Sequence, residues 1–158
     1  MSEADHWATY AAAGFTCWPE LGEPISVEPV ADGTIVGTFP LSGPTCFVTA
    51  HNPGGPPIAP SENDRRHAAF VRDIAEHGWH TWPAVGGDPG GFHAEEGVLL
   101  LDATVDDALA LGARFDQDAI YVWRADAMDL VACDRSRHDV LGWRATVGTT
   151  SLRRPTPG

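Results

Sequence analysis

The sequence predicts an α+β fold: a two-layer sandwich with a ferredoxin-like βαββαβ core at about residues 45–124, extra strands at both ends and a short N-terminal helix. Apolar runs of strand length alternate with segments of helical periodicity in the order strand, helix, strand, strand, helix, strand. Residues typical of N-caps precede both core helices. Helices on one face of a mostly antiparallel sheet follow from this order.

The segment before the core is expected to contribute one helix and two strands. The run "SEAD" resembles a capping box, and Trp7, Tyr10 and Ala11 follow at helical spacing, so a helix is expected at about 3–13. The segments "PISVEPV" and "GTIVGTF" are expected to be strands, because "ADG" between them is a turn signal.

The first half of the core combines a buried strand, a long loop and a helix. The apolar run "TCFVTA" is the expected strand, and "HNPGGPPIAP" cannot be regular structure because it is rich in proline and glycine. Ser61 is expected to cap the helix, with Asp64 in the reciprocal position. Phe70, Val71 and Ile74 form one apolar face of that helix.

The second half of the core repeats this pattern. "WHTWPAV" and "AEEGVLLLD" are expected strands on either side of a turn, "GGDPGG". Thr104 and Asp107 form a capping box that predicts a helix over 105–114. "AIYVW" and "MDLVACD" are expected to pair with each other, and "GWRATVG" to be an edge strand.

Length and composition predict one globular domain over residues 1–158. Its parts are an N-terminal helix and strands (1–44), the core with the strand after it (45–134) and a tail expected to fray (150–158). The formal net charge of −12 argues against a nucleic-acid partner. No long apolar run or signal peptide is apparent, and three widely spaced cysteines indicate no disulfide framework. We therefore expect a soluble cytoplasmic protein without a membrane partner.

One group of polar residues lies where the first core strand ends and the next helix begins. A loop that returns from strand to helix would bring these side chains together, and helix N-termini offer free N–H groups. We expect them to bind a substrate, although the alternative is that they only cap the helix. The residues are Thr49, His51, Asn52, Glu62, Asn63 and Arg66.

A second group, "GFHAEEG", contains His93, Glu95 and Glu96. Neighbouring residues of a strand face opposite sides, so one glutamate points towards the interior or a pocket. A partly buried Glu95 can serve as general acid or base with His93 assisting, and Gln117 can orient a substrate carbonyl. The alternative for this group is a solvated strand start. A site of His51, His93 and Glu95 would suit a metal, but the spacing does not require it, and we expect no metal and no cofactor.

Four motifs follow one another along the chain: "FVTAHNP", "SEN", "PAVGGDPGGFHAEEGVLLL" and "ARFDQDAIYVW". Together they resemble a bacterial family labelled domain of unknown function 3293, and the resemblance implies that polar groups at element ends act together. Two positions depart from the family pattern: His93 replaces a tryptophan and Asp116 a glycine. The matched positions are Thr49, Asn52, Pro53, Glu62, Asn63, Gly86, Asp88, Glu95, Phe115 and Gln117.

These observations predict an enzyme that acts on a small polar metabolite, with a glutamate as general acid or base. Two alternatives remain open at this point. The same pocket can belong to a non-catalytic module that binds a small molecule or forms a homodimer. The polar groups can also be purely structural, since buried polar atoms must be hydrogen-bonded whether or not a ligand is present.

Overall fold

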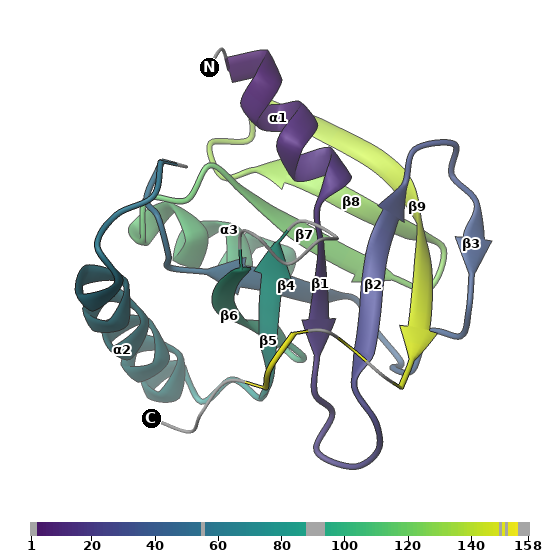
Figure 1. The fold of residues 1–158 in the computed structure, drawn as a ribbon, viewed down its shortest axis with the longest axis horizontal. Helices are drawn as coiled ribbons and strands as arrows, with labels where there is room; N and C mark the ends of the chain where they lie inside the picture. The colour runs from purple at the N-terminus through teal and green to yellow at the C-terminus, as the bar shows by residue number, and fades with distance from the viewer. Residues whose placement is uncertain (1–2, 55, 88–93, 149, 151, 155–158) are drawn as a thin grey trace.

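A computed structural model of the chain describes residues 3–54, 56–87, 94–148, 150 and 152–154. Within this part of the chain, nine strands form one sheet in the order β2-β1-β5-β6-β4-β7-β8-β9-β3. Strand β2 also pairs with β9, so that the first eight strands of this order close into an antiparallel barrel (Figure 1). The short β3 pairs in parallel with Trp143 and Arg144 of β9.

The elements of the described chain are three helices and nine strands. They are α1 (Glu3–Ala12), β1 (Gly14–Cys17), β2 (Ile25–Val30), β3 (Ile35–Val36), β4 (Thr45–Thr49), α2 (Pro60–His77), β5 (Thr81–Gly87), β6 (Ala94–Leu100), α3 (Val105–Arg114), β7 (Ala119–Arg124), β8 (Ala127–Ala132) and β9 (His138–Val147).

The predicted ferredoxin-like sandwich is wrong, because the sheet does not end at the edges of the predicted core. Strands β5, β6, β4 and β7 lie side by side, but β1 and β2 continue the sheet beyond β5, and β8 and β9 continue it beyond β7. Residues 25–30 of β2 then pair with residues 142–147 of β9. Closure gives each of the eight barrel strands a neighbour on both sides, which an open sheet cannot do.

The inside of the barrel is filled by a first apolar core rich in aromatic rings. Phe15 and Phe47 stack with their ring centroids 5.2 Å apart, and Trp123 and Trp143 meet edge to face at 5.6 Å. Trp123 and Trp143 are almost completely buried. An eight-stranded barrel is just wide enough for side chains to fill, and here bulky aromatic residues occupy the interior.

Phe47 occupies its place inside the barrel only because two glycines leave room for it. A Cβ atom added at Gly86 would lie 2.6 Å from the Phe47 ring, and one at Gly97 would lie 3.1 Å from it and 2.5 Å from the carbonyl oxygen of Val48. Gly86 and Gly97 belong to neighbouring strands. Gly86 lies within β5, so the expected turn begins later than predicted, and residues 88–91 of it lie outside the described chain.

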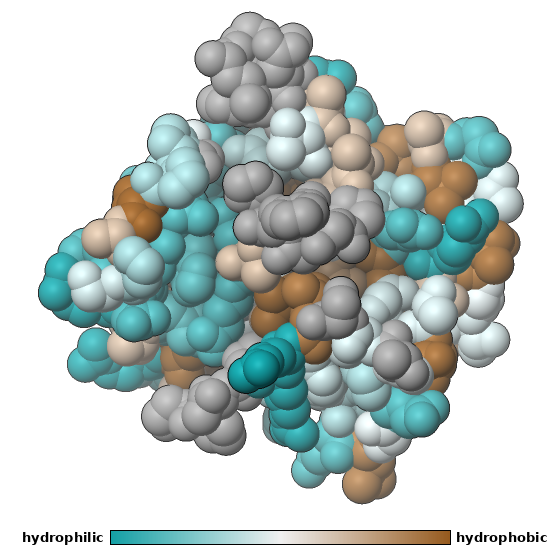
Figure 2. Space-filling model, viewed as in Figure 1, coloured by the Kyte–Doolittle hydropathy of each residue, from teal (hydrophilic) through white to brown (hydrophobic). Residues whose placement is uncertain are grey.

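A second apolar core lies outside the barrel, between its wall and helices α2 and α3. Phe70 and Ile74 of α2 and Leu109 of α3 pack there with Val98 and Val122 of the wall. The opposite side of α2 faces solvent, and Figure 2 shows mostly hydrophilic residues over this helix. Strands β4, β6 and β7 are therefore apolar on both faces, which explains why their sequences read as continuous apolar runs.

The start of α3 was predicted correctly, and the start of α2 was not. Thr104 and Asp107 form the reciprocal capping box of α3, which confirms that prediction. The predicted cap of α2 is wrong: Ala59 is the N-cap residue, no side chain caps it, and Pro60 stands at the first helical turn. Proline suits this position because its missing N–H would have no intrahelical partner there.

Other expectations at the ends of the chain had mixed outcomes. The N-terminal helix is confirmed as α1, whereas the predicted strand over 33–39 is reduced to the two residues of β3. Strand β1 was not predicted. Much of the expected tail, residues 151 and 155–158, lies outside the described chain. No helix in the described part combines the length and apolar character that crossing a membrane requires.

Candidate functional site

Strand β6 sends two neighbouring glutamates to opposite sides of the barrel wall. Glu95 has the same parity as Leu99, which belongs to the inner core, whereas Glu96 has the parity of Val98 and Leu100 of the outer core. Glu95 therefore faces the interior at one end of the barrel. Glu96 faces outward, towards α2.

An asparagine network, which we define as Asn52, Asn63 and Glu95 with the backbone N–H of Ile58, joins the loop after β4 to α2 and β6. The Asn63 side chain pairs twice with Asn52: its Oδ1 accepts from the Asn52 backbone N–H, and its Nδ2 donates to Asn52 Oδ1, both at 2.9 Å. Asn52 Oδ1 also accepts from Ile58 N–H, and Asn52 Nδ2 donates to Glu95 Oε1 at 2.8 Å.

The backbone of Asn52 explains why an asparagine stands at the centre of this network. Its φ angle is 49°, in the left-handed region that asparagine tolerates better than most residues. This conformation turns the chain so that both the N–H and the side chain reach Asn63. The long proline-rich loop is therefore fixed near its start by side-chain hydrogen bonds.

A second set of contacts joins the same loop to the corner between α3 and β7. Arg66 of α2 donates from Nε to the carbonyl oxygen of Ala50 at 2.8 Å, and its guanidinium also contacts the Phe115 carbonyl and the Asp116 carboxylate. Gln117 Nε2 donates to the carbonyl oxygen of His51 at 3.0 Å. Segments far apart in the sequence thus converge beside the start of β6.

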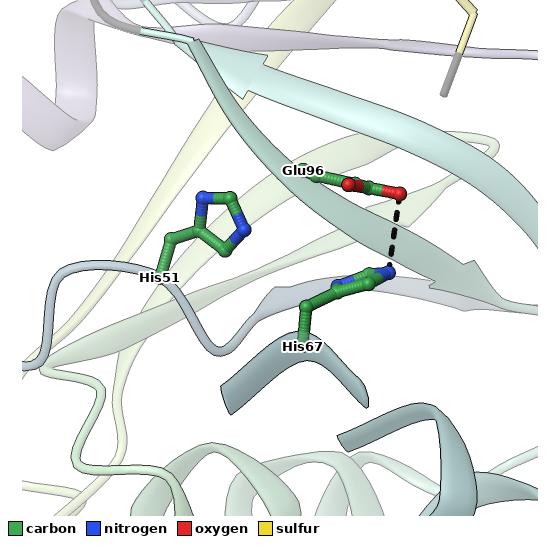
Figure 3. A group of neighbouring side chains, drawn as sticks. All are labelled: His51, His67 and Glu96. Carbon is green, nitrogen blue, oxygen red and sulfur yellow. Dashed lines mark ion pairs between the residues drawn. The ribbon is translucent and has the colours of Figure 1, made fainter. Parts of the chain in front are cut away.

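A histidine cluster, which we define as His51, His67 and Glu96, lies between the barrel wall and α2. Figure 3 shows the three side chains directed towards one another from the loop after β4, from α2 and from β6. The His67 Nε2 and Glu96 Oε1 atoms are 3.2 Å apart, and the two imidazole rings meet edge to face with centroids 5.9 Å apart. His51 Nε2 and His67 Nδ1 are buried, and neither has a hydrogen-bond partner among the described residues.

Burial lowers the pKa of His51 to about 4. The neighbouring His67 and Arg66 act in the same direction, whereas Asp64 opposes them. An imidazole with so low a pKa is neutral at pH 7, so one of its two ring nitrogens carries a lone pair.

At the end of the barrel, α1 covers the side chains around Glu95. The Tyr10 hydroxyl donates to Asp118 at 2.8 Å, and the Tyr121 hydroxyl donates to the Tyr10 carbonyl. Burial raises the pKa of both tyrosines, and the negative charge of Glu95 contributes to each shift. Glu95 therefore lies close enough to both tyrosines for its charge to affect them, as the charge of Asp118 affects Tyr10.

A hollow of about 160 Å³ opens beside this end of the barrel. Its lining includes Trp7 of α1, Gln117 and Asp118 before β7, and Asp134 and Arg137 between β8 and β9. It therefore presents carboxylates, an amide and a guanidinium. A larger hollow of about 200 Å³ lies on the outer side of β1, β2 and β9, away from the predicted site residues.

The remaining predicted site residues occupy different surroundings. Thr49 links two backbone segments: its hydroxyl donates to the Glu96 carbonyl at 2.7 Å and accepts from the His51 N–H at 3.1 Å. Glu62 is exposed on α2, where it pairs with Arg65. His93 lies outside the described residues, so the structure says nothing about its predicted assistance to Glu95 or about its part in a metal site with His51.

Sequence reasoning missed three residues that lie close to these groups: His67, Tyr10 and Asp118. A signal for His67 was present, because it follows Asn63 by four residues and side chains at that spacing share one face of a helix. No comparable local signal connects Tyr10 to Asp118, which are 108 residues apart in the chain.

The cysteines take no part in these clusters. Cys17, Cys46 and Cys133 are all free, and burial raises the pKa of each to about 12. Thiols with such pKa values do not form reactive thiolates at neutral pH. This agrees with packed cysteines and not with nucleophiles.

The motifs of this region match a known family. Residues 48–120 match the model of a family described as "Protein of unknown function (DUF3293)". We call residues 48–120 the DUF3293 segment. The match confirms the resemblance found in the sequence motifs, while no curated protein and no solved structure is similar enough to the chain to match it.

The DUF3293 segment covers one side of the barrel. It runs from within β4 to the start of β7 and includes α2, β5, β6 and α3. It contains the complete asparagine network and the complete histidine cluster. Helix α1 and strands β1, β2, β3, β8 and β9 lie outside it, so the barrel is closed by strands that the family model does not include.

Proposed function

We propose that the chain is an enzyme that binds a small polar metabolite at the barrel end beneath α1, with Glu95 as general acid or base. One observation carries this proposal: the Glu95 carboxylate is only partly exposed, faces inward and is held by Asn52 at 2.8 Å. A positioned carboxylate in partly desolvated surroundings is a group that can exchange protons near neutral pH.

The neighbouring hollow supports a small, polar ligand. Asp118 and Arg137 are both part of its lining, so opposite charges are available to a molecule with hydroxyl, amine or carboxylate groups. Glu95 is not one of the lining residues, and Tyr10 connects the two places through its bond to Asp118. Proton transfer would therefore require the ligand to reach past Tyr10 towards Glu95.

For Asn52 and Asn63 we propose a structural role within this enzyme. Their amide groups are bonded to each other, to Ile58 and to Glu95, which supports the fixing of the loop and of the acid or base more than direct contact with substrate. Gln117 is different, because it lines the hollow while its Nε2 holds the His51 carbonyl. It remains a proposed substrate-binding residue.

The proposed partner class and cellular compartment follow from the net charge and the free cysteines. The formal net charge of −12 disfavours nucleic acid as a partner. Three free cysteines are consistent with a reducing compartment, and we propose the cytoplasm.

A thermal-shift screen against a library of polar metabolites, followed by assays for product, tests the proposal. We expect a ligand that stabilises the protein, and turnover that Glu95→Gln abolishes while the variant remains folded. Glu76→Gln is the control, because Glu76 is an exposed carboxylate of the same segment and has no proposed role.

The other outcomes distinguish the alternatives. If a ligand binds, Asp118→Asn weakens its binding and no assay yields a product, the protein is a non-catalytic binding module. Failure to find any ligand, together with a stability loss of about 1–3 kcal/mol in Glu95→Gln, would leave a structural role for the carboxylate.

A further inference from the structure

The histidine cluster has a composition and geometry that the proposed reaction at Glu95 does not use. We propose that His51, His67 and Glu96 bind a divalent transition-metal ion on the outer side of the barrel wall. This inference does not depend on the proposed enzyme, because Glu95 and Glu96 face opposite sides of β6.

The three ligand atoms lie nearly at the spacing that a single ion requires. One nitrogen of each ring and one carboxylate oxygen are all within 4.8 Å of one another, and this is the one such group among the described residues. Nitrogen and oxygen ligands bound to one zinc ion at about 2.0–2.1 Å are separated by about 3.3 Å. The His67–Glu96 distance of 3.2 Å already has this value. A small rotation of the His51 side chain would bring the third ligand into place.

The unpaired nitrogens are the second observation that indicates a ligand. His51 Nε2 and His67 Nδ1 are buried and have no hydrogen-bond partner among the described residues. Buried polar atoms in folded proteins nearly always have a partner, and an exception calls for an explanation such as an ion. Coordination through His51 Nε2 would satisfy one of these atoms directly.

The scaffold holds the ligand-bearing segments in fixed relative positions. The Thr49 hydroxyl binds the backbone of both His51 and Glu96, at 3.1 Å and 2.7 Å. Gln117 Nε2 donates to the carbonyl oxygen of His51 at 3.0 Å. Thr49 and Gln117 are therefore positioning residues of the site, because they fix the backbone of two ligands without offering a ligand atom themselves.

Two imidazoles and one carboxylate define the class of ion. Imidazole suits zinc, iron, nickel, cobalt and copper, and a two-histidine, one-carboxylate set leaves coordination positions open for water. Solvent can reach the cluster, since the His67 and Glu96 side chains are 18% and 32% exposed. The site therefore fits a first-row divalent ion that keeps bound water.

Titration of the untagged protein with Co²⁺ tests this proposal, after treatment with a chelator. We expect one equivalent to bind with visible d–d absorption and with a dissociation constant below about 10 μM, and Zn²⁺ to displace it. His67→Ala and Glu96→Gln should each weaken binding at least about 100-fold, because even the outer-shell partners of metal ligands contribute 10–100-fold.

His80→Ala is the matched control. His80 and Asp102 form a histidine–carboxylate pair at 2.7 Å on the surface, so its loss should leave affinity and stoichiometry unchanged. Circular dichroism of each variant verifies folding, and Glu96→Gln preserves side-chain shape if His67→Ala does not fold. The proposal is overturned if Co²⁺ and Zn²⁺ do not bind, or if binding survives both His67→Ala and Glu96→Gln.

Discussion

The asparagine network and the histidine cluster are built from the same three elements, yet they differ in how completely their polar atoms are paired. His51 and Asn52 are neighbours in the loop after β4, and Glu95 and Glu96 are neighbours on β6. Asn63 and His67 are one turn apart on α2. In the asparagine network every side chain has a partner within the protein, whereas two buried nitrogens of the histidine cluster have none among the residues that the structure describes.

This difference indicates that the asparagine network is structural and that the histidine cluster is a binding site. A network whose donors and acceptors satisfy one another stabilises the fold and has no need of a ligand. A buried nitrogen without a hydrogen-bond partner costs stability until a further group, such as a metal ion, binds to it. The loop after β4, α2 and β6 thus each contribute one residue that fixes the loop and a nearby residue that can bind a metal ion.

The largest expected effect comes from removing the centre of the asparagine network. Asn52→Ala should lower the free energy of unfolding by about 3 kcal/mol. It leaves Asn63 Nδ2 and the Ile58 N–H without their partner Asn52 Oδ1, at about 1–3 kcal/mol, and places alanine in left-handed backbone, at about 1–2 kcal/mol. Urea unfolding measures the change.

Asn52→Gly separates these two contributions. Glycine tolerates the φ angle of 49° but makes none of the side-chain bonds, so about 1 kcal/mol of the loss should be recovered. Equal stability of the two variants would show that backbone strain contributes nothing.

The next effect is the stabilisation of the histidine cluster by metal. At a free Zn²⁺ concentration of 100 times its dissociation constant, the free energy of unfolding should rise by about 2.7 kcal/mol. Thermal unfolding with and without Zn²⁺ should show this rise in the wild type and in Asn63→Asp, but not in His67→Ala. A rise that persists in His67→Ala would remove the distinction between the two clusters.

A smaller effect is expected from Asn63→Asp. The carboxylate still accepts from the Asn52 backbone N–H, but the Nδ2 donor to Asn52 Oδ1 is lost. The loss of stability should be about 1–2 kcal/mol in urea unfolding, because one hydrogen bond is lost and a carboxylate is placed in buried surroundings beside Asn52 Oδ1. A stability equal to that of the wild type would contradict the pairing described here.

The smallest effect should follow from His67→Leu in the metal-free protein. The variant removes a ring with an unpaired Nδ1 and a partly exposed ion pair, which contributes about 0–1 kcal/mol. The free energy of unfolding should therefore change by less than about 1 kcal/mol. A loss above about 2 kcal/mol would show that the histidine cluster is as structural as the asparagine network.

Much of the secondary structure could be predicted from local sequence signals. The helix after Thr104 follows from a capping box that involves residues three positions apart, and the buried strand β4 follows from a short apolar run. The missed strand β1 has only four residues, too few for an alternating pattern to be distinguished from a loop. The failed cap at Ser61 arose because Pro60 provides a different helix start.

The candidate site was also predicted in part from local sequence signals. Asn52, Asn63 and Glu95 were singled out because polar residues at the ends of apolar segments need partners, and the structure brings these three together. The role of His67 was missed because its partner Glu96 lies 29 positions away in the chain. Which side chains of that strand point outward depends on the register of the sheet.

The sequence by itself determined where most helices and strands lie and that polar side chains gather at the ends of β4 and β6, because capping, turns and periodicity are interactions between near neighbours. Only the tertiary structure decided that Ile25 to Val30 of β2 meet Val147 to Gly142 of β9 and close the sheet into a barrel. It also decided which glutamate of β6 faces each cluster. Both outcomes depend on strand pairing across most of the chain, and no local interaction specifies the partner.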